Sequence, residues 1–300
     1  MNIQSAGVVE GISNFVTAVL TYRKFLGSSI AFRGQKGEWD PWPSLFRKDR
    51  KPAYMNEDKL VREIVSAHPY EFNDDKTMFD RLVRMQHHDL PTRLLDVSIN
   101  PLVALWFATE QNLDDSGNET DGMVILYIIP EARAKFFDSD AVSCIANLAN
   151  LKFGQKEQVL DHAYKLSTIL KHGEKDAHRL ITIFNENLAV DQLYYQIGME
   201  KPHFRKIINP EHLVTPFYVK PKMSNKRIAA QSGAFLIYPA HPERSEIFSD
   251  SKLTISMISF KIPAKAKKEL RDDLQHLGIH GGSLFPGLDR SSAYIMESMK

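Results

Sequence analysis

The sequence is poor in cysteine, in long apolar stretches and in signal-peptide features, which are typical of secreted and membrane proteins. It holds a single cysteine, Cys144, which excludes an internal disulfide and leaves too few thiolates for a cysteine-based zinc site. No stretch approaches the roughly 18 apolar residues that a bilayer-spanning helix needs. The first residues, Met1 to Ser5, also lack the basic segment of a signal peptide. We therefore expect a cytoplasmic protein without membrane contact.

Basic and acidic residues are nearly equal in number. Lys and Arg number 38 against 37 Asp and Glu, which leaves a formal net charge of +1. This balance excludes a protein that captures nucleic acid through bulk positive charge, so any anion must be bound by individually placed cations. With 300 residues, 43% of them hydrophobic, and only 15 glycines and 15 prolines, the chain is neither disordered nor fibrous and can bury a large core.

The common catalytic signatures are missing as well. There is no GxGxxG, P-loop, HExxH or GxSxG motif, so dinucleotide-fold oxidoreductases, Walker-type nucleotidases, zinc peptidases and α/β-hydrolases have no support. His87 and His88 would point about 100° apart on a helix, which is poor geometry for chelating one ion, and we expect no metal. Cys144 has no basic neighbour to activate it, which favours a buried, unreactive thiol.

Hydrophobic spacing predicts an α+β fold with strands near both ends of the chain and a helical middle. Asn100 and Pro101 are typical of a helix start, and the helix predicted over 102–108 is apolar on nearly every side, so it should be buried. The other predicted helices are 1–26, 60–65, 79–86 and the segment after Pro263, and the predicted strands are 29–34, 123–129, 215–219, 234–238 and 253–260. We divide the chain into a first core part, 1–131, a helical insertion, 132–206, and a second core part, 207–300.

Several polar residues stand inside apolar sequence. Arg33 follows Ala31-Phe32 at a strand end, Arg93 and Asp96 flank two leucines, and Gln231 precedes a strand. Because an unpaired buried charge costs several kcal/mol, two interpretations are open. Either Asp96 forms an internal ion pair with Arg33 or Arg93, or these residues line a polar cleft in which Arg33 binds the phosphate or carboxylate of a ligand.

Several blocks of the chain, in order, resemble the bacterial FRG domain, a family associated with defence and toxin-like genes. The matching blocks are Phe32-Arg33-Gly34-Gln35, the segments 42–47 and 87–96, the Asn100-Pro101 helix to Ala108, and the later segments 227–235 and 284–289. The blocks span most of the chain.

A weaker resemblance is to arginine-class ADP-ribosyltransferases. Phe32-Arg33-Gly34 is similar to their aromatic-Arg-Gly strand end, Asp96-Val97-Ser98 stands in place of a Ser-Thr-Ser strand, and Gln231-Ser232-Gly233 stands where a Glu-x-Glu is found. The resemblance implies a split β-sheet core and NAD as the substrate. It assigns NAD binding to Arg33, Gly34, Arg93, Ser98 and Gln231, and catalysis to Asp96, Gln231 and His88. Gly233 cannot supply the charge of the second Glu, so Asp96 or another carboxylate would have to replace it.

Three hypotheses follow. The first is an NAD-consuming enzyme that transfers ADP-ribose to a protein or nucleic acid, or hydrolyses NAD, as a toxin or anti-phage defence effector. The second is a non-catalytic module that binds a nucleotide or a phage component. The third is a nuclease, suggested by the aromatic and basic mixture of Trp39, Trp42, Arg47, Lys48, Arg50 and Lys51. An open cleft that gathers Arg33, Asp96, Ser98 and Gln231 would favour the first, and a closed ion network would favour a structural role.

Overall fold

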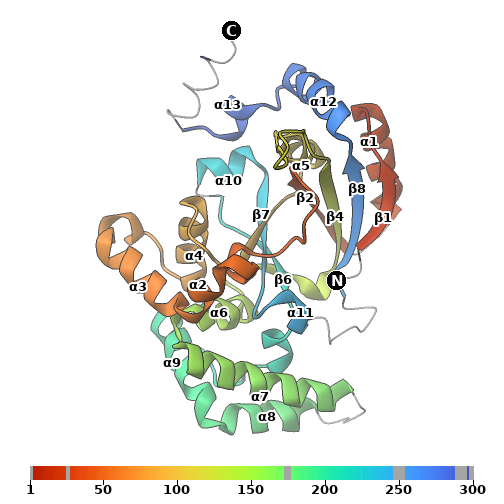
Figure 1. Ribbon diagram of the computed structural model, residues 1–300. Helices are drawn as coiled ribbons and strands as arrows, with labels where there is room; N and C mark the ends of the chain where they lie inside the picture. The colour runs from red at the N-terminus through yellow and green to blue at the C-terminus, as the bar shows by residue number, and fades with distance from the viewer. Residues whose placement is uncertain are drawn as a thin grey trace.

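An eight-stranded mixed sheet forms the centre of the protein (Figure 1). The computed structural model describes residues 3–24, 28–171, 177–223, 225–245, 254–287 and 296. The strand order is β1-β8-β4-β2-β3-β7-β6-β5, with the edge strands β1 and β5 parallel to their neighbours and the interior pairs antiparallel. The strands are β1 (Ile3–Val8), β2 (Ser28–Gln35), β3 (Leu94–Ser98), β4 (Gly122–Pro130), β5 (Ala134–Phe136), β6 (Phe217–Lys220), β7 (Gly233–Ile237) and β8 (Ser256–Ile262). The mixed sheet with its helices confirms the α+β class.

The sheet is nearly divided between β2 and β3. Strand β2 pairs with β4 along its whole length, from Ser28 to Gln35. Its pairing with β3 consists of one register position, Phe32 opposite Ser98. The halves β1-β8-β4-β2 and β3-β7-β6-β5 are therefore joined at one point, and polar side chains near that point lie at a boundary in the sheet.

Helices cover both halves of the sheet. They are α1 (Ile12–Leu20), α2 (Lys51–Met55), α3 (Glu57–Ala67), α4 (Met78–His87), α5 (Pro101–Ala108), α6 (Asp140–Ala146), α7 (Phe153–Lys171), α8 (Ala177–Glu186), α9 (Leu188–Glu200), α10 (Lys226–Ala230), α11 (Pro242–Ser245), α12 (Ala264–His276) and α13 (Gly281–Leu284). One core cluster joins α1, α5 and α12 to β2, β4 and β8. Another joins α3, α4 and α6 to α9 with β3, β6 and β7, and in Figure 1 helices α7 to α9 gather at the end opposite α12.

Helix α5 is buried, as its apolar sequence predicts. The Asn100 side-chain oxygen accepts the Leu102 N–H at 3.0 Å and caps the first turn. The helix lies directly on the sheet, because a Cβ at Gly34 would stand 1.8 Å from the Ala104 carbonyl oxygen. The glycine that ends the Phe-Arg-Gly segment is therefore required by this close approach.

The predicted helix over 1–26 is wrong in its first part. Residues Ile3–Val8 form β1, which pairs with β8, and the helix begins only at Ile12. The amphipathic stripe that suggested the helix starts with Phe15, whereas β1 is mostly exposed and is fixed by backbone pairing at a sheet edge. The segment expected as helical from 132 likewise contains β5 before α6. The start of the strand predicted over 253–260 and the end of 1–26 lie outside the described residues.

In the part of the chain that the structure describes, no helix is both long and apolar enough to cross a bilayer.

Candidate functional site

An open pocket lies at the boundary between β2 and β3. Its volume is about 250 Å³. It is lined by Phe32, Arg33, Gly34, Gln35, Lys36, Trp39, Arg47, Asp96, Val97, Ser98, Val103, Ala104, Phe107, Glu110, Arg227 and Gln231. These residues come from β2 and the segment after it, from β3, and from α5 and α10. The pocket thus combines apolar and charged walls, as ligand sites commonly do.

Arg33 bridges the two halves of the sheet. Its Nη1 donates to the Asp96 carbonyl oxygen at 2.8 Å, and its Nε donates to Gln35 Oε1 at 3.2 Å. The Gln35 amide in turn donates to the Trp39 carbonyl oxygen at 2.7 Å. All these partners are neutral, so the guanidinium charge is oriented without a carboxylate contact and can bind an anion. Of the two open interpretations, the Arg33–Asp96 ion pair is not formed, and this contact to the Asp96 backbone takes its place.

The carboxylate of Asp96 is exposed and is held by a chain of hydrogen bonds. Gln86 Nε2 donates to Asp96 Oδ2 at 2.6 Å, and the Thr92 hydroxyl donates to Gln86 Oε1 at 2.6 Å. The Leu94 N–H donates to the Thr92 hydroxyl at 3.1 Å. Sequence reasoning missed this role of Gln86, because the residue follows the apolar stripe of α4, where packing is the ordinary interpretation.

Ser98 and Gln231 join β3 to the turn between α10 and β7. The Ser98 hydroxyl donates to the Gln231 carbonyl oxygen at 2.7 Å and accepts the Asn100 N–H at 3.0 Å. The Gln231 amide donates to the Leu284 carbonyl oxygen at 3.2 Å. Ser232, which directly follows Gln231, has a φ of 46°, in the left-handed region that is costly for a serine. Both residues line the pocket, and their hydrogen bonds fix its wall.

Cations outnumber carboxylates around the pocket. Arg33, Lys36, Arg47 and Arg227 line it together with Asp96 and Glu110. Desolvation and the nearby Arg33 guanidinium lower the pKa of Arg47 from its ordinary value. Arg227 donates to the His87 carbonyl oxygen at 3.3 Å and lies 5.0 Å from the centre of the Phe285 ring. This excess of positive charge favours an anionic ligand.

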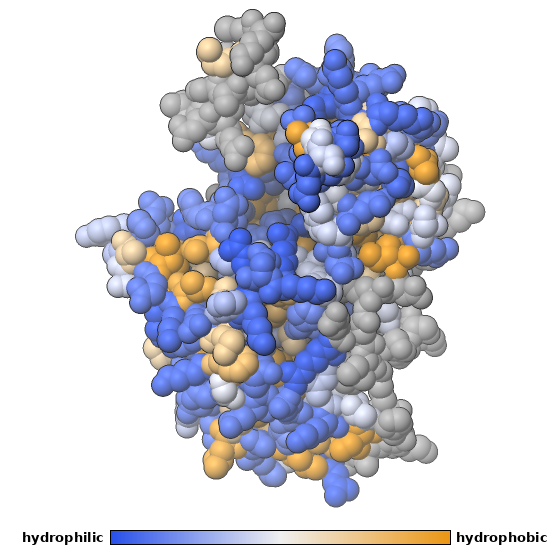
Figure 2. All heavy atoms as spheres, viewed as in Figure 1, coloured by the Kyte–Doolittle hydropathy of each residue, from blue (hydrophilic) through white to orange (hydrophobic). Residues whose placement is uncertain are grey.

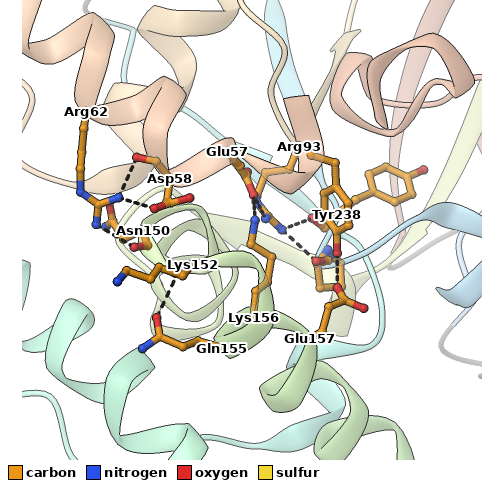
Figure 3. A network of polar contacts seen from close by, with 12 residues as sticks. Glu57, Asp58, Arg62, Arg93, Asn150, Lys152, Gln155, Lys156, Glu157 and Tyr238 are labelled. Atoms are coloured by element: carbon orange, nitrogen blue, oxygen red, sulfur yellow. Dashed lines mark hydrogen bonds and ion pairs between the residues drawn. The ribbon is translucent and has the colours of Figure 1, made fainter. Parts of the chain in front are cut away.

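Arg93 is not part of the pocket, contrary to its expected role in binding NAD. It is completely buried and donates to both carboxylate oxygens of Glu57, at 2.9 and 2.5 Å (Figure 3). Its Nη1 donates to the carbonyl oxygens of Tyr238 and Pro239 at 3.1 and 2.8 Å. Lys156 of α7 completes the network through Glu57. Arg93 therefore ties the start of β3 to α3, and its partner is Glu57, not Asp96, which was one of the alternatives that the sequence left open.

His88 also lies outside the pocket. It is exposed and lines a separate depression of about 90 Å³ with His87, Asp80 and Arg84. The Nδ1 of His87 lies 2.8 Å from the Asn225 amide nitrogen, and burial, together with the charge of Arg227, lowers the pKa of His87 to about 4. α4 ends at His87, just before His88, and the side chain that this helix presents to the Asp96 carboxylate is Gln86.

Cys144 is buried in α6, and burial raises the pKa of its thiol well above the ordinary value. A thiol in this environment is a poor nucleophile. Within the described residues, no cluster of three or more His, Cys, Asp or Glu side chains is placed to hold a metal ion.

Comparison with known families supports the resemblance to FRG domains. The FRG domain model matches residues 28–117, a range that holds Arg33, Gly34, Asp96 and Ser98 but ends before Gln231. The FRG resemblance is thereby confirmed over this range. No curated protein and no solved structure matches the chain.

Proposed function

We propose that this protein is an NAD-consuming enzyme of the ADP-ribosyltransferase type, which modifies a macromolecule as a toxin or anti-phage defence effector. The observation that carries the proposal is the meeting of Arg33, Asp96, Ser98 and Gln231 in one open pocket where the sheet is nearly divided. The defence role rests on the genes with which FRG domains are associated.

The pocket offers the groups that such a substrate needs. Arg33 and Arg47 present guanidinium groups to one space, and planar guanidinium groups suit the oxygens of a pyrophosphate. Phe32 and Phe107 supply apolar surface for an aromatic ring such as nicotinamide. Gly233 cannot provide a carboxylate, but Asp96 and Glu110 both line the pocket. Of these two, Asp96 is the one whose carboxylate is exposed and oriented by Gln86.

The chemistry assigns one role to Asp96. The bond between C1′ of the ribose and the nicotinamide nitrogen breaks, and its electron pair leaves with neutral nicotinamide. Positive charge then develops at C1′, where a fixed carboxylate stabilises it. An acceptor oxygen or nitrogen forms the new bond to C1′ and releases its proton to solvent or to the carboxylate. With water as the acceptor, the same steps hydrolyse NAD.

The test uses NAD labelled either in the nicotinamide or in the adenine ring, incubated with the protein and a cell lysate. We expect nicotinamide release and transfer of the adenine label to macromolecules. Arg33→Ala should mainly raise KM, whereas Asp96→Asn should lower kcat by roughly 100-fold or more. The exposed Lys59→Ala and Asp74→Asn are charge-matched controls that lie outside the pocket. The proposal would be refuted if the wild-type protein neither released nicotinamide nor transferred the adenine label.

A second candidate is a module that binds a nucleotide or a phage component without chemistry. It is favoured by one observation, the glycine at position 233 where the transferase resemblance calls for a carboxylate. Calorimetry with ADP-ribose separates the two. Binding that is weakened by Arg33→Ala, with NAD left intact over a long incubation, would support the module instead of the enzyme.

A further inference from the structure

A run of basic residues follows directly after the pocket. Arg47, which lines the pocket, begins it, and Lys48, Arg50 and Lys51 continue it; we call these four residues the basic rim. All four are exposed. Figure 2 shows a hydrophilic area at the centre of the face drawn there, over the segment that joins β2 to α2 in Figure 1.

The charges of the basic rim are largely uncompensated. Asp49 pairs with Arg50 at 3.2 Å. Among the described residues no carboxylate forms an ion pair with Arg47, Lys48 or Lys51. Arg33 and Arg47 also repel each other, which contributes to the lowered pKa of Arg47. Because these exposed cations are clustered, they produce a local positive potential even though the whole protein has a net charge of only +1.

The segment that carries these charges is firmly attached to the core. Leu45 is fully buried, and its N–H donates to the Thr92 carbonyl oxygen at 3.1 Å. The Thr92 N–H in return donates to the Ser44 hydroxyl at 3.1 Å. Phe46 is buried against Tyr54, with ring centres 5.5 Å apart. The backbone that carries the cations is thus held next to the pocket before any ligand arrives, which reduces the entropy lost on binding.

An aromatic side chain accompanies the basic rim. Trp39 lines the same pocket, and 40% of its surface is exposed. Trp42 differs, since it is only partly exposed and packs against His241 at 4.4 Å between ring centres. Trp39 is therefore the tryptophan of this segment whose ring a ligand can reach from the pocket.

We propose that the basic rim and Trp39 bind single-stranded nucleic acid and hold it as the acceptor at the mouth of the pocket. Cations in a row neutralise successive phosphates, and an exposed indole stacks on a base whatever the sequence. An amino, ring-nitrogen or hydroxyl group of the strand then attacks C1′ and loses its proton, while nicotinamide leaves with the electron pair. This inference rests on the proposed function for the chemistry, but the binding can be measured without it.

The experiment measures fluorescence anisotropy with labelled single-stranded DNA and RNA of equal length, over a range of salt concentrations. The variant Lys48→Ala/Arg50→Ala/Lys51→Ala should bind at least ~10-fold more weakly at low salt. The negative slope of log affinity against log salt should become shallower by about 2. The control removes three exposed lysines elsewhere, Lys59→Ala/Lys152→Ala/Lys268→Ala, and should bind as the wild type does. Trp39→Ala should weaken binding roughly 5- to 150-fold at any salt.

Two readouts keep the outcomes apart. The basic-rim triple variant should still release nicotinamide into water at the wild-type rate, because its three residues do not line the pocket, but should lose label transfer to the strand. Equal binding by the wild type and both triple variants would overturn the inference, as would label found on proteins alone. The proposed enzyme would survive either result as long as nicotinamide is released.

Discussion

The side-chain amide of Gln86 donates to the Asp96 carboxylate at 2.6 Å, and a second hydrogen bond fixes the orientation of this amide. The Thr92 hydroxyl donates to the amide oxygen of Gln86 at 2.6 Å, so the NH₂ group must face Asp96. The carboxylate is thereby oriented at the pocket by a residue that does not line it. On the proposed function, Gln86 would be a positioning residue, and kinetics can separate that role from a purely structural one.

Gln86→Met keeps the length of the side chain and removes the donor. If Asp96 acts in the transition state as proposed, we expect kcat for nicotinamide release to fall about 10-fold with little change in KM, since the lost interaction orients that carboxylate. Steady-state kinetics measure both constants, and thermal unfolding checks that the protein is intact. Thr92→Val should show the same effect in weaker form. A rise in KM with unchanged kcat would contradict the positioning role.

The sequence left two interpretations of its polar residues open, an ion pair or a ligand cleft, and the structure places these residues differently. Arg33 and Asp96 stand out in the sequence because a charge inside apolar sequence needs a partner or a ligand, and both line the pocket. The same reasoning applied to Arg93 and missed its partner, because Glu57 lies 36 positions earlier in the chain and only the fold brings them together. A hydrophobic pattern does not tell a buried ion pair from a ligand site.

Gly34→Ala should destabilise the protein by more than about 1–3 kcal/mol, the usual range for overpacking. The new Cβ would stand 1.8 Å from the backbone oxygen of Ala104, and α5 cannot withdraw without opening the core. Gly154→Ala and Gly198→Ala are matched controls inside α7 and α9, where nothing lies within 4 Å of the added Cβ, and these should gain about 0.5–1 kcal/mol. Urea unfolding measures all three. A Gly34→Ala protein as stable as the controls would show that α5 does not rest on β2.

Local patterns predicted the interior elements well and the edges poorly. Strand β4 is a continuous β-branched and apolar run and is buried on both faces, so its sequence suffices. The short edge strands β1 and β5 contain no comparable pattern, and each exists because a neighbouring strand offers backbone partners. The pairing of β2 with β3 at the single register position of Phe32 and Ser98 likewise has no signal in either strand.

Glu57→Gln should lower the free energy of unfolding by about 3–5 kcal/mol, because it leaves the buried charges of Arg93 and Lys156 without a carboxylate. Burial alone would raise the pKa of Glu57, but Arg93 and Lys156 reverse this and lower it. A lowered pKa stabilises the fold above the ordinary value of 4.5, and this stabilisation is lost as the pH falls below it. The control Asp49→Asn breaks an exposed pair and should cost less than about 1 kcal/mol. Equal losses in urea unfolding would contradict a structural role for the network.

Two buried histidines should make the protein less stable as the pH falls below 6.5. Burial lowers the pKa of His87 and of His212 to about 4, helped by Arg227 at the first and by Lys135 and Arg133 at the second. Between the ordinary value of 6.5 and about 4, the unfolded chain binds a proton at each histidine that the folded chain does not. The free energy of unfolding should therefore decrease as the pH falls through this window, by at most about 1.4 kcal/mol per pH unit for each histidine.

His212→Phe tests this directly. The imidazole packs edge-on against Phe217 at 5.4 Å between ring centres, so a phenyl ring keeps most of the contact. Well above pH 6.5, His212 is uncharged in both the folded and the unfolded chain. Urea unfolding there measures only the difference in packing between His212 and the phenyl ring. Below that pH the variant should lose stability less steeply than the wild type, and the two curves should converge or cross as the pH approaches 4. Parallel curves over the whole range would mean that His212 takes up no proton on unfolding.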